Sequence, residues 1–200
     1  DGFVIPQSLA ICEYLEEIHP EPQLLPGSAR DRAMVRGMAM VVACDTHPLN
    51  NLPIMGYLRR EFGADDAAVN RWVGHWIDRG FAALERWVAS VPGAPAAASE
   101  QRYCFGAAPT LADVCLVPQM YNARRFSVDV TPYPRLVAIC AHLEALPAFA
   151  AARPEVQPVE RVAHQLPVHE IARVQHGETG HRVHGRPREV EVVADADQVG

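Results

Sequence analysis

Ser8 stands where a helix is expected to begin, and no acidic residue follows closely enough to close that helix end. Apolar side chains at positions 11, 14, 15 and 18 have helical spacing, and serine is a good N-cap. The third residue after Ser8 is Ile11, and residues 9–12 include no Asp or Glu. Free N–H groups at the positive end of a helix can bind an external anion, although most serine caps serve only their own helix. The spacing leaves both interpretations open.

Two arginines, Arg124 and Arg125, end a second helical stretch that starts at Thr110. Cations are favoured at a helix C-terminus because they face the negative end of the helix dipole. This interpretation needs no ligand and assigns no function.

The cysteines and histidines do not form a metal-binding pattern. The five cysteines, at positions 12, 44, 104, 115 and 140, have no C-x-x-C spacing and are odd in number, which suits reduced thiols in the cytosol. Most have apolar neighbours and are expected to be small core residues. Five of the nine histidines follow residue 150, with no zinc-binding spacing. We therefore expect a cytoplasmic protein without a metal site.

The composition excludes some classes of partner. The chain has 200 residues, 49% of them hydrophobic, which is enough for one substantial core. Its formal net charge of −6 argues against nucleic acid or an anionic membrane as the main partner. No apolar run approaches the roughly 18 residues that span a bilayer, and no secretory signal is visible.

The elements that must position these residues are mainly helices. Residues 3–5 are typical of a short edge strand that Pro6 ends, and a proline-rich linker covers residues 19–27. A helix is predicted from Ser28 to about Asp45, and the strongest helical period of the chain follows Asp66. The three tryptophans of that helix, at 72, 76 and 87, are interpreted as core or packing surface. A further helix is expected over residues 134–146.

The helix that begins after Thr110 is expected to be central. Thr110 and Asp113 form a Ser/Thr-x-x-acid capping box, which closes the N-terminus of the helix on itself. Residues 114–117 are apolar on every face, which predicts a helix that is buried all round. Pro118 removes one backbone hydrogen bond and should bend the helix.

Residues 105–136, FGAAPTLADVCLVPQMYNARRFSVDVTPYPRL, resemble the late C-terminal segment of zeta-class glutathione transferases, the group that includes the maleylacetoacetate isomerases. A bare T-L-A-D box is common to glutathione transferases, whereas LVPQ followed by NARRF is specific to the zeta class. The resemblance covers residues 1–158, with DGFVIPQSLAICEYLEE, PQLLPGSARDRA and DTHPLNN as further matching stretches.

The resemblance implies a mainly α fold: a glutathione-transferase C-terminal helical domain, preceded by the last piece of a thioredoxin-like α/β domain. Residues 1–26 would be the remnant of the glutathione-binding domain and linker, residues 27–159 the all-α substrate domain, and residues 160–200 a disordered extension. The Ser/Cys-rich motif that activates the thiol in this class is absent from the sequence, so no catalytic residue is assigned. We expect a truncated chain that does not turn over substrate by itself.

The resemblance also implies ligand-binding residues. Gln7 and Ser8 would hold the γ-glutamyl carboxylate of glutathione, at the open helix end described above. Asn51 would reach glutathione across a homodimer interface, or would merely cap a helix. Arg125 would bind a substrate carboxylate, or would be a surface cation; the surface interpretation suits Arg124 better.

The implied activity is glutathione-dependent cis–trans isomerisation of maleylacetoacetate or maleylpyruvate, a small dicarboxylate, in the catabolism of aromatic compounds. The thiolate of glutathione adds to the cis double bond, the resulting single bond rotates, and the thiolate leaves, so that glutathione acts as a cofactor. Two alternatives stay open. One is a broad glutathione S-transferase that conjugates small electrophiles, and the other is a non-catalytic interaction module of the same fold.

Overall fold

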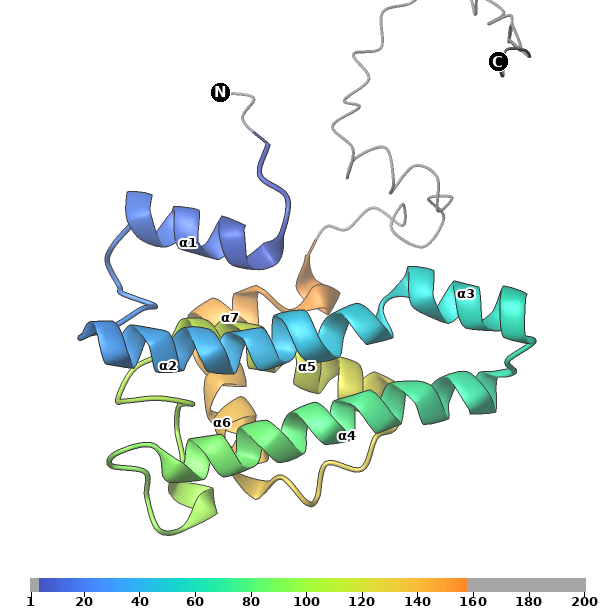
Figure 1. The fold of residues 1–200 in the computed structure, drawn as a ribbon. Coiled ribbons are helices and arrows are strands. Elements are labelled where there is room, and N and C mark those ends of the chain that lie inside the picture. Colours follow the sequence, from blue (N-terminus) through green and yellow to red (C-terminus); the bar gives the residue numbers. More distant parts are fainter. Residues whose placement is uncertain (1–3, 158–200) are drawn as a thin grey trace, which may run out of the picture. The chain divides into compact units, whose positions relative to one another are not determined.

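The computed structural model describes residues 4–157, and every regular element within that range is a helix. Residues 4–6 form no strand, so the strand expected at 3–5 is not found in the part of it that is described. The expected extension at 160–200 lies outside the described residues. The chain is mainly α, as predicted, and Figure 1 shows the arrangement of its helices.

The helices follow one another with short connections. In chain order they are α1 (Ser8–Ile18), α2 (Ala29–Met40), the π-helix η1 (Val41–Thr46), the 3-10 helix η2 (His47–Asn50), α3 (Leu52–Phe62), α4 (Asp66–Ser90), η3 (Ala98–Glu100), α5 (Leu111–Arg125), α6 (Pro134–Glu144), α7 (Pro147–Ala151) and η4 (Pro154–Val156).

The expected helix over residues 28–45 consists of α2 and the π-helix η1, which ends where His47 and Pro48 begin η2. Ser28 and Asp31 form a capping box at its start. The π-helix packs against α4 where Gly80 has no side chain, and a Cβ at that position would overlap the Thr46 hydroxyl. Close approach of η1 and α4 therefore requires glycine at position 80.

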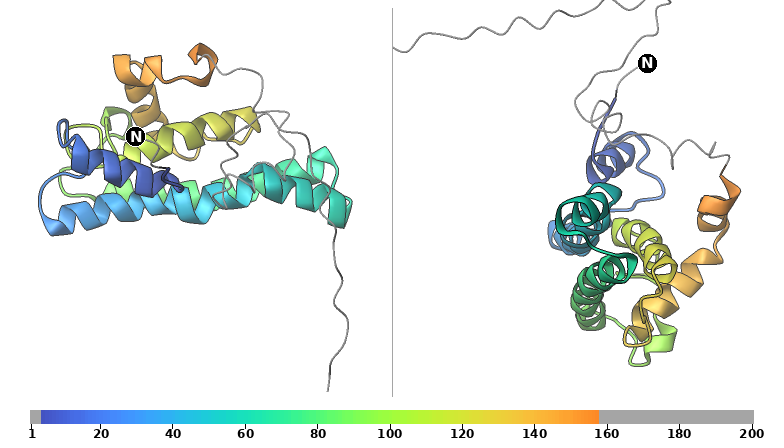
Figure 2. Two further views of the ribbon diagram at one scale, coloured as in Figure 1. Left: turned by 90° about the horizontal axis from the view of Figure 1, so that it is seen from above. Right: turned by 90° about the vertical axis from the view of Figure 1, so that its right-hand side faces the viewer.

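Helix α5 lies between α2 and α6 (Figures 1 and 2). Its predicted capping box is present: the Asp113 carboxylate accepts hydrogen bonds from the Thr110 N–H and hydroxyl, both at 2.7 Å. The prediction of burial on all sides is only partly right, because Val114 and Val117 are half-buried and Tyr121 is 40% exposed. One face of α5 borders cavities instead of packed side chains.

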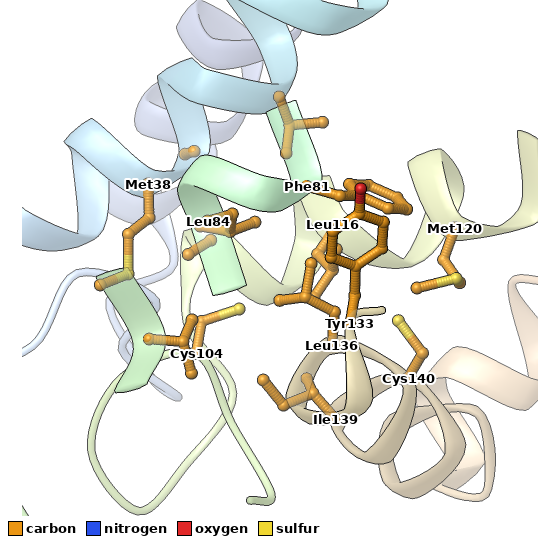
Figure 3. Close-up of a cluster of buried hydrophobic side chains, with 14 of the residues drawn as sticks. Met38, Phe81, Leu84, Cys104, Leu116, Met120, Tyr133, Leu136, Ile139 and Cys140 are labelled. Carbon is orange, nitrogen blue, oxygen red and sulfur yellow. The ribbon is translucent and has the colours of Figure 1, made fainter. Parts of the chain in front are cut away.

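A single hydrophobic core joins α2, α4, α5 and α6 (Figure 3). In Figure 3 the ring of Tyr133 lies against Phe81, with ring centroids 5.6 Å apart and planes at 82°, an edge-to-face contact. The face of α4 predicted to be apolar is buried along its length, at Val69, Val73, Ile77, Phe81, Leu84 and Val88. This core fixes α5, and with it the residues that α5 presents to the cavities.

Candidate functional site

The N-terminus of α1 has no side chain closing it. Gln7 is the N-cap and Ser8 is the first helical residue, so the helix begins one position earlier than the sequence predicts. No side chain makes a capping hydrogen bond there, and the first turn contains no acidic residue. Gln7 has a φ of 75° and a ψ of 120°, a conformation that costs a non-glycine residue of order 1–3 kcal/mol. Strain of this kind is concentrated at ligand-binding sites, and the free N–H groups beside it can donate hydrogen bonds to an anion.

Ser8 lies at the edge of a cavity of about 320 Å³. The cavity is lined by residues of three elements: α1, the segment from η1 to η2, and α5. Its polar and sulfur-containing side chains are those of Ser8, Cys12, His47, Cys115, Gln119, Tyr121 and Asn122. The exposed helix end and the core helix α5 therefore meet at one cavity.

The lining of this cavity favours a ligand that accepts hydrogen bonds. No carboxylate is among its lining residues. Burial raises the pKa of the Cys115 thiol to about 12 and also raises the pKa of Cys12, so both thiols are protonated at neutral pH and neither is an activated nucleophile. A carboxylate or carbonyl oxygen fits this site, because it would meet the positive end of α1 and several donors. Within residues 4–157 no group of His, Cys, Asp and Glu could hold a metal ion.

Asn51 has a structural role in this chain. It is the N-cap of α3, and its Oδ1 accepts a hydrogen bond of 3.2 Å from the Ile54 N–H. Its neighbour Asn50 is 3% exposed, and neither its Oδ1 nor its Nδ2 has a hydrogen-bond partner among the described residues.

Arg124 and Arg125 occupy different surroundings. Arg124 donates to the Glu144 carboxylate at 2.6 Å and borders a second cavity of about 680 Å³, between α5, the end of α6 and α7. Arg125 is exposed, and its guanidinium lies 5.8 Å from the centre of the Phe126 ring. Arg124 thus has an ion-pair partner on α6, which suits its interpretation as a surface cation.

Among the predicted site residues, Ser8 lines the 320 Å³ cavity, whereas Gln7, Asn51 and Arg125 line none of the cavities described here. Gln119 and His47 do line it, and the sequence analysis assigned them no role. A polar residue inside an apolar helix was the available signal for Gln119. His47 was noted only as part of the DTHPLNN stretch that resembles the family.

Comparison with known proteins places these features in a family. A probable maleylacetoacetate isomerase of Vibrio cholerae is 49% identical over 152 residues, which span 76% of this chain and 67% of that protein. A maleylpyruvate isomerase from a Ralstonia species is 51% identical over 155 residues, which span 78% of this chain and 70% of that protein. The chain belongs to the maleylacetoacetate and maleylpyruvate isomerase family of zeta-class glutathione transferases. No family model matches the sequence.

Solved structures of this family share the fold. The holo structure of a maleylpyruvate isomerase, described as a bacterial zeta-class glutathione S-transferase, superposes with a TM-score of 0.74 at 50% identity, covering 80% of this chain and 72% of that one. A maleylacetoacetate isomerase from Anaeromyxobacter dehalogenans, solved with glutathione in its active site, has a TM-score of 0.70 at 43% identity, covering 78% of this chain and 68% of that one. The same Anaeromyxobacter enzyme has also been solved with dicarboxyethyl glutathione and citrate bound.

Proposed function

We propose that this chain belongs to a glutathione-dependent enzyme that isomerises maleylacetoacetate or maleylpyruvate to the trans form. Residues 1–26 would then end the glutathione-binding domain and its linker, and residues 27–159 would form the helical substrate domain. The observation that carries the proposal is the uncapped, acid-free start of α1, which opens onto a donor-lined cavity in a member of this family.

Glutathione would be held at the start of α1. The γ-glutamyl carboxylate needs donors and a positive environment, which the free N–H groups of the first turn and the Ser8 hydroxyl offer. Gln7 would add its side-chain amide, and its strained backbone sets the direction from which the chain enters the helix. When bound, glutathione supplies a thiol that adds reversibly to the substrate's conjugated double bond.

Arg125 would anchor a substrate carboxylate. It is exposed at the end of α5, whereas the neighbouring Arg124 is already engaged by Glu144. The planar guanidinium can bind a carboxylate through two parallel hydrogen bonds and can compensate negative charge that develops on the substrate during the reaction.

The protein would act as a homodimer in the cytoplasm. Helix α3 exposes Leu52, Tyr57 and Phe62, and Phe62 is 72% exposed, which suits a surface covered by a partner subunit. Asn51 is the N-cap of this helix. Its Oδ1 is used by the cap, which leaves its amide N–H groups for glutathione in the neighbouring subunit.

All five cysteines of the chain lie among the described residues and are free thiols, which suits a reducing compartment. No helix within residues 4–157 is long and apolar enough to cross a membrane.

Steady-state kinetics on matched arginine variants test this proposal. In the protein that carries this chain, isomerisation of maleylpyruvate should saturate with glutathione. Arg125→Ala should lower kcat/KM for the dicarboxylate about 10- to 150-fold, mostly through KM, because it removes a charge-assisted contact of about 1.5–3 kcal/mol. The glutathione KM should hardly change.

Arg124→Ala is the control, with an expected effect on kcat/KM within about 0.5 kcal/mol, as for other surface cations. An unchanged substrate KM in Arg125→Ala would place the anchor elsewhere. Isomerisation that proceeds equally well without glutathione would contradict the proposed function itself.

A further inference from the structure

Two glutamines are almost fully buried in this protein, and they differ in their hydrogen bonding. Gln101 is 4% exposed; its Nε2 donates to the Tyr103 carbonyl at 2.7 Å and its Oε1 accepts from Arg135 at 3.1 Å. Gln119 is 2% exposed, and its Nε2 has no hydrogen-bond partner among the described residues. Both are surrounded by protein, but only Gln101 has both ends of its amide satisfied.

An unpaired amide donor in the interior is costly. Leaving a buried N–H group without a partner destabilises a protein by about 1–3 kcal/mol, and more than nine in ten buried polar groups avoid this cost. Helix α5 could carry leucine or methionine at this position, as it does at Leu116 and Met120, without the cost. The donor therefore calls for a partner that is not part of the described chain.

The cavity beside Gln119 shows where such a partner can lie. Gln119 lines the 320 Å³ cavity that Ser8 also lines, so the residue that carries the unpaired donor on α5 and the uncapped end of α1 border the same space. Neither donor set has a partner on a described side chain: α1 has no capping side chain, Gln119 Nε2 is unpaired, and the cavity lining contains no carboxylate. Donors from two different helices thus border one cavity whose lining contains no anionic acceptor.

We propose that Gln119 is a further ligand-binding residue of the glutathione site, and that its Nε2 donates a hydrogen bond to an oxygen of the γ-glutamyl end of glutathione. This inference rests on the proposed function and deepens it, because it adds a contact from the core helix α5 to a site otherwise built from Gln7 and Ser8. The Gln119 side chain favours a ligand that places a hydrogen-bond acceptor beside α5. It has no part in activating the thiol.

The test uses two variants of the protein that carries this chain, Gln119→Met and Gln101→Met, each with an unbranched side chain of similar size. Glutathione binding is measured by isothermal titration calorimetry, and the melting temperature of the ligand-free protein by circular dichroism. Gln119→Met should raise the glutathione Kd about tenfold or more, because a hydrogen bond to a charged oxygen is lost. Its Tm in the absence of ligand should not fall, and should rise by a few degrees, because the variant removes an unpaired buried donor and breaks no hydrogen bond of this donor within the protein.

Gln101→Met should behave in the opposite way. Its Tm should fall by about 4 °C or more, because Arg135 and the Tyr103 carbonyl lose their buried partner, while its glutathione Kd should stay unchanged. An unchanged glutathione Kd in Gln119→Met would overturn the inference and leave the proposed function standing. A fall in Tm like that of Gln101→Met would also overturn it, by showing that Gln119 has a structural role. If the parent protein itself did not bind glutathione, the proposed function would fail, and this inference with it.

Discussion

Replacing Asp113 by alanine should destabilise the protein more than any cap substitution at its surface. The Asp113 carboxylate is fully buried and accepts hydrogen bonds from the Cys104 N–H at 2.8 Å and from the Thr110 N–H and hydroxyl at 2.7 Å. It closes the N-terminus of α5 and ties that helix to the preceding loop. Position 113 therefore controls the placement of both Gln119 and Arg125.

The size of the effect follows from these contacts. Three hydrogen bonds to a charged group, at about 1.5–3 kcal/mol each, would sum to about 4.5–9 kcal/mol. Burial opposes this sum, because it disfavours the ionised carboxylate, and it is the largest reason why the pKa of Asp113 is raised. Removing one partner from a buried charged network typically costs about 3–5 kcal/mol, which we take as the expected loss for Asp113→Ala. In a protein of this size that corresponds to a fall in Tm of about 6–20 °C.

Helix α2 supplies the matched control. Ser28 and Asp31 form the same kind of capping box, but Ser28 is exposed and Asp31 is only half-buried. Asp31→Ala should therefore cost only about 0.5–1 kcal/mol. Both variants would be compared with the parent by urea and thermal unfolding, followed by circular dichroism. Equal losses for Asp113→Ala and Asp31→Ala would refute the argument that burial makes the α5 cap exceptional.

Three further predictions concern stability. Gly80→Ala should lower the free energy of unfolding by about 1–3 kcal/mol, because the new methyl group overlaps the Thr46 hydroxyl. Gly56→Ala, with no atom within 4 Å of the new Cβ, should raise it by about 0.5–1 kcal/mol. Both would be measured by denaturant unfolding, and a change of the same sign in the two variants would contradict this prediction. Glu85→Ala should cost about 1–2 kcal/mol in the same assay, since its carboxylate accepts two backbone N–H groups in the first turn of α6, and an unchanged midpoint would show that water replaces it. The raised pKa of Asp113 means that the folded protein holds this proton more tightly than the unfolded chain, so Asp113 contributes more to the free energy of unfolding as the pH falls towards its ordinary pKa of 3.8. The Tm of the parent should therefore exceed that of Asp113→Asn by more at pH 4.5 than at pH 7.5. A smaller Tm difference at pH 4.5 would show that folding lowers this pKa instead.

The parts of the fold set by local chemistry could be predicted from the sequence. The spacing of Thr110 and Asp113 predicted the capping box that begins α5, because such a box depends on four consecutive residues only. The acid-free start of α1 was predicted for the same reason, although the cap falls on Gln7 instead of Ser8. The one-residue error is typical of helix ends, and the free N–H groups are unaffected by it.

Features that depend on tertiary neighbours were not predicted. The apolar run at residues 114–117 suggested burial on all sides, yet one face of α5 borders cavities, and a hydrophobic pattern cannot show which of its faces has a neighbour. The unpaired donor of Gln119 was not predictable, because whether a buried amide finds a partner depends on side chains far away in sequence. The π-helix before His47 was not predicted, because the close approach of Gly80 that accompanies it depends on α4, a later helix of the chain.

The central claim, that glutathione serves as a cofactor of isomerisation in this protein, is tested most directly by the balance of thiol during turnover. Maleylpyruvate would be converted by the protein that carries this chain in the presence of a limiting amount of glutathione, and free thiol and trans product would be measured together over many turnovers. Product should accumulate well beyond the amount of glutathione added, while the concentration of free thiol returns to its starting value. Loss of one thiol for each substrate consumed would show that the protein conjugates glutathione to its substrate and does not use it as a cofactor of isomerisation.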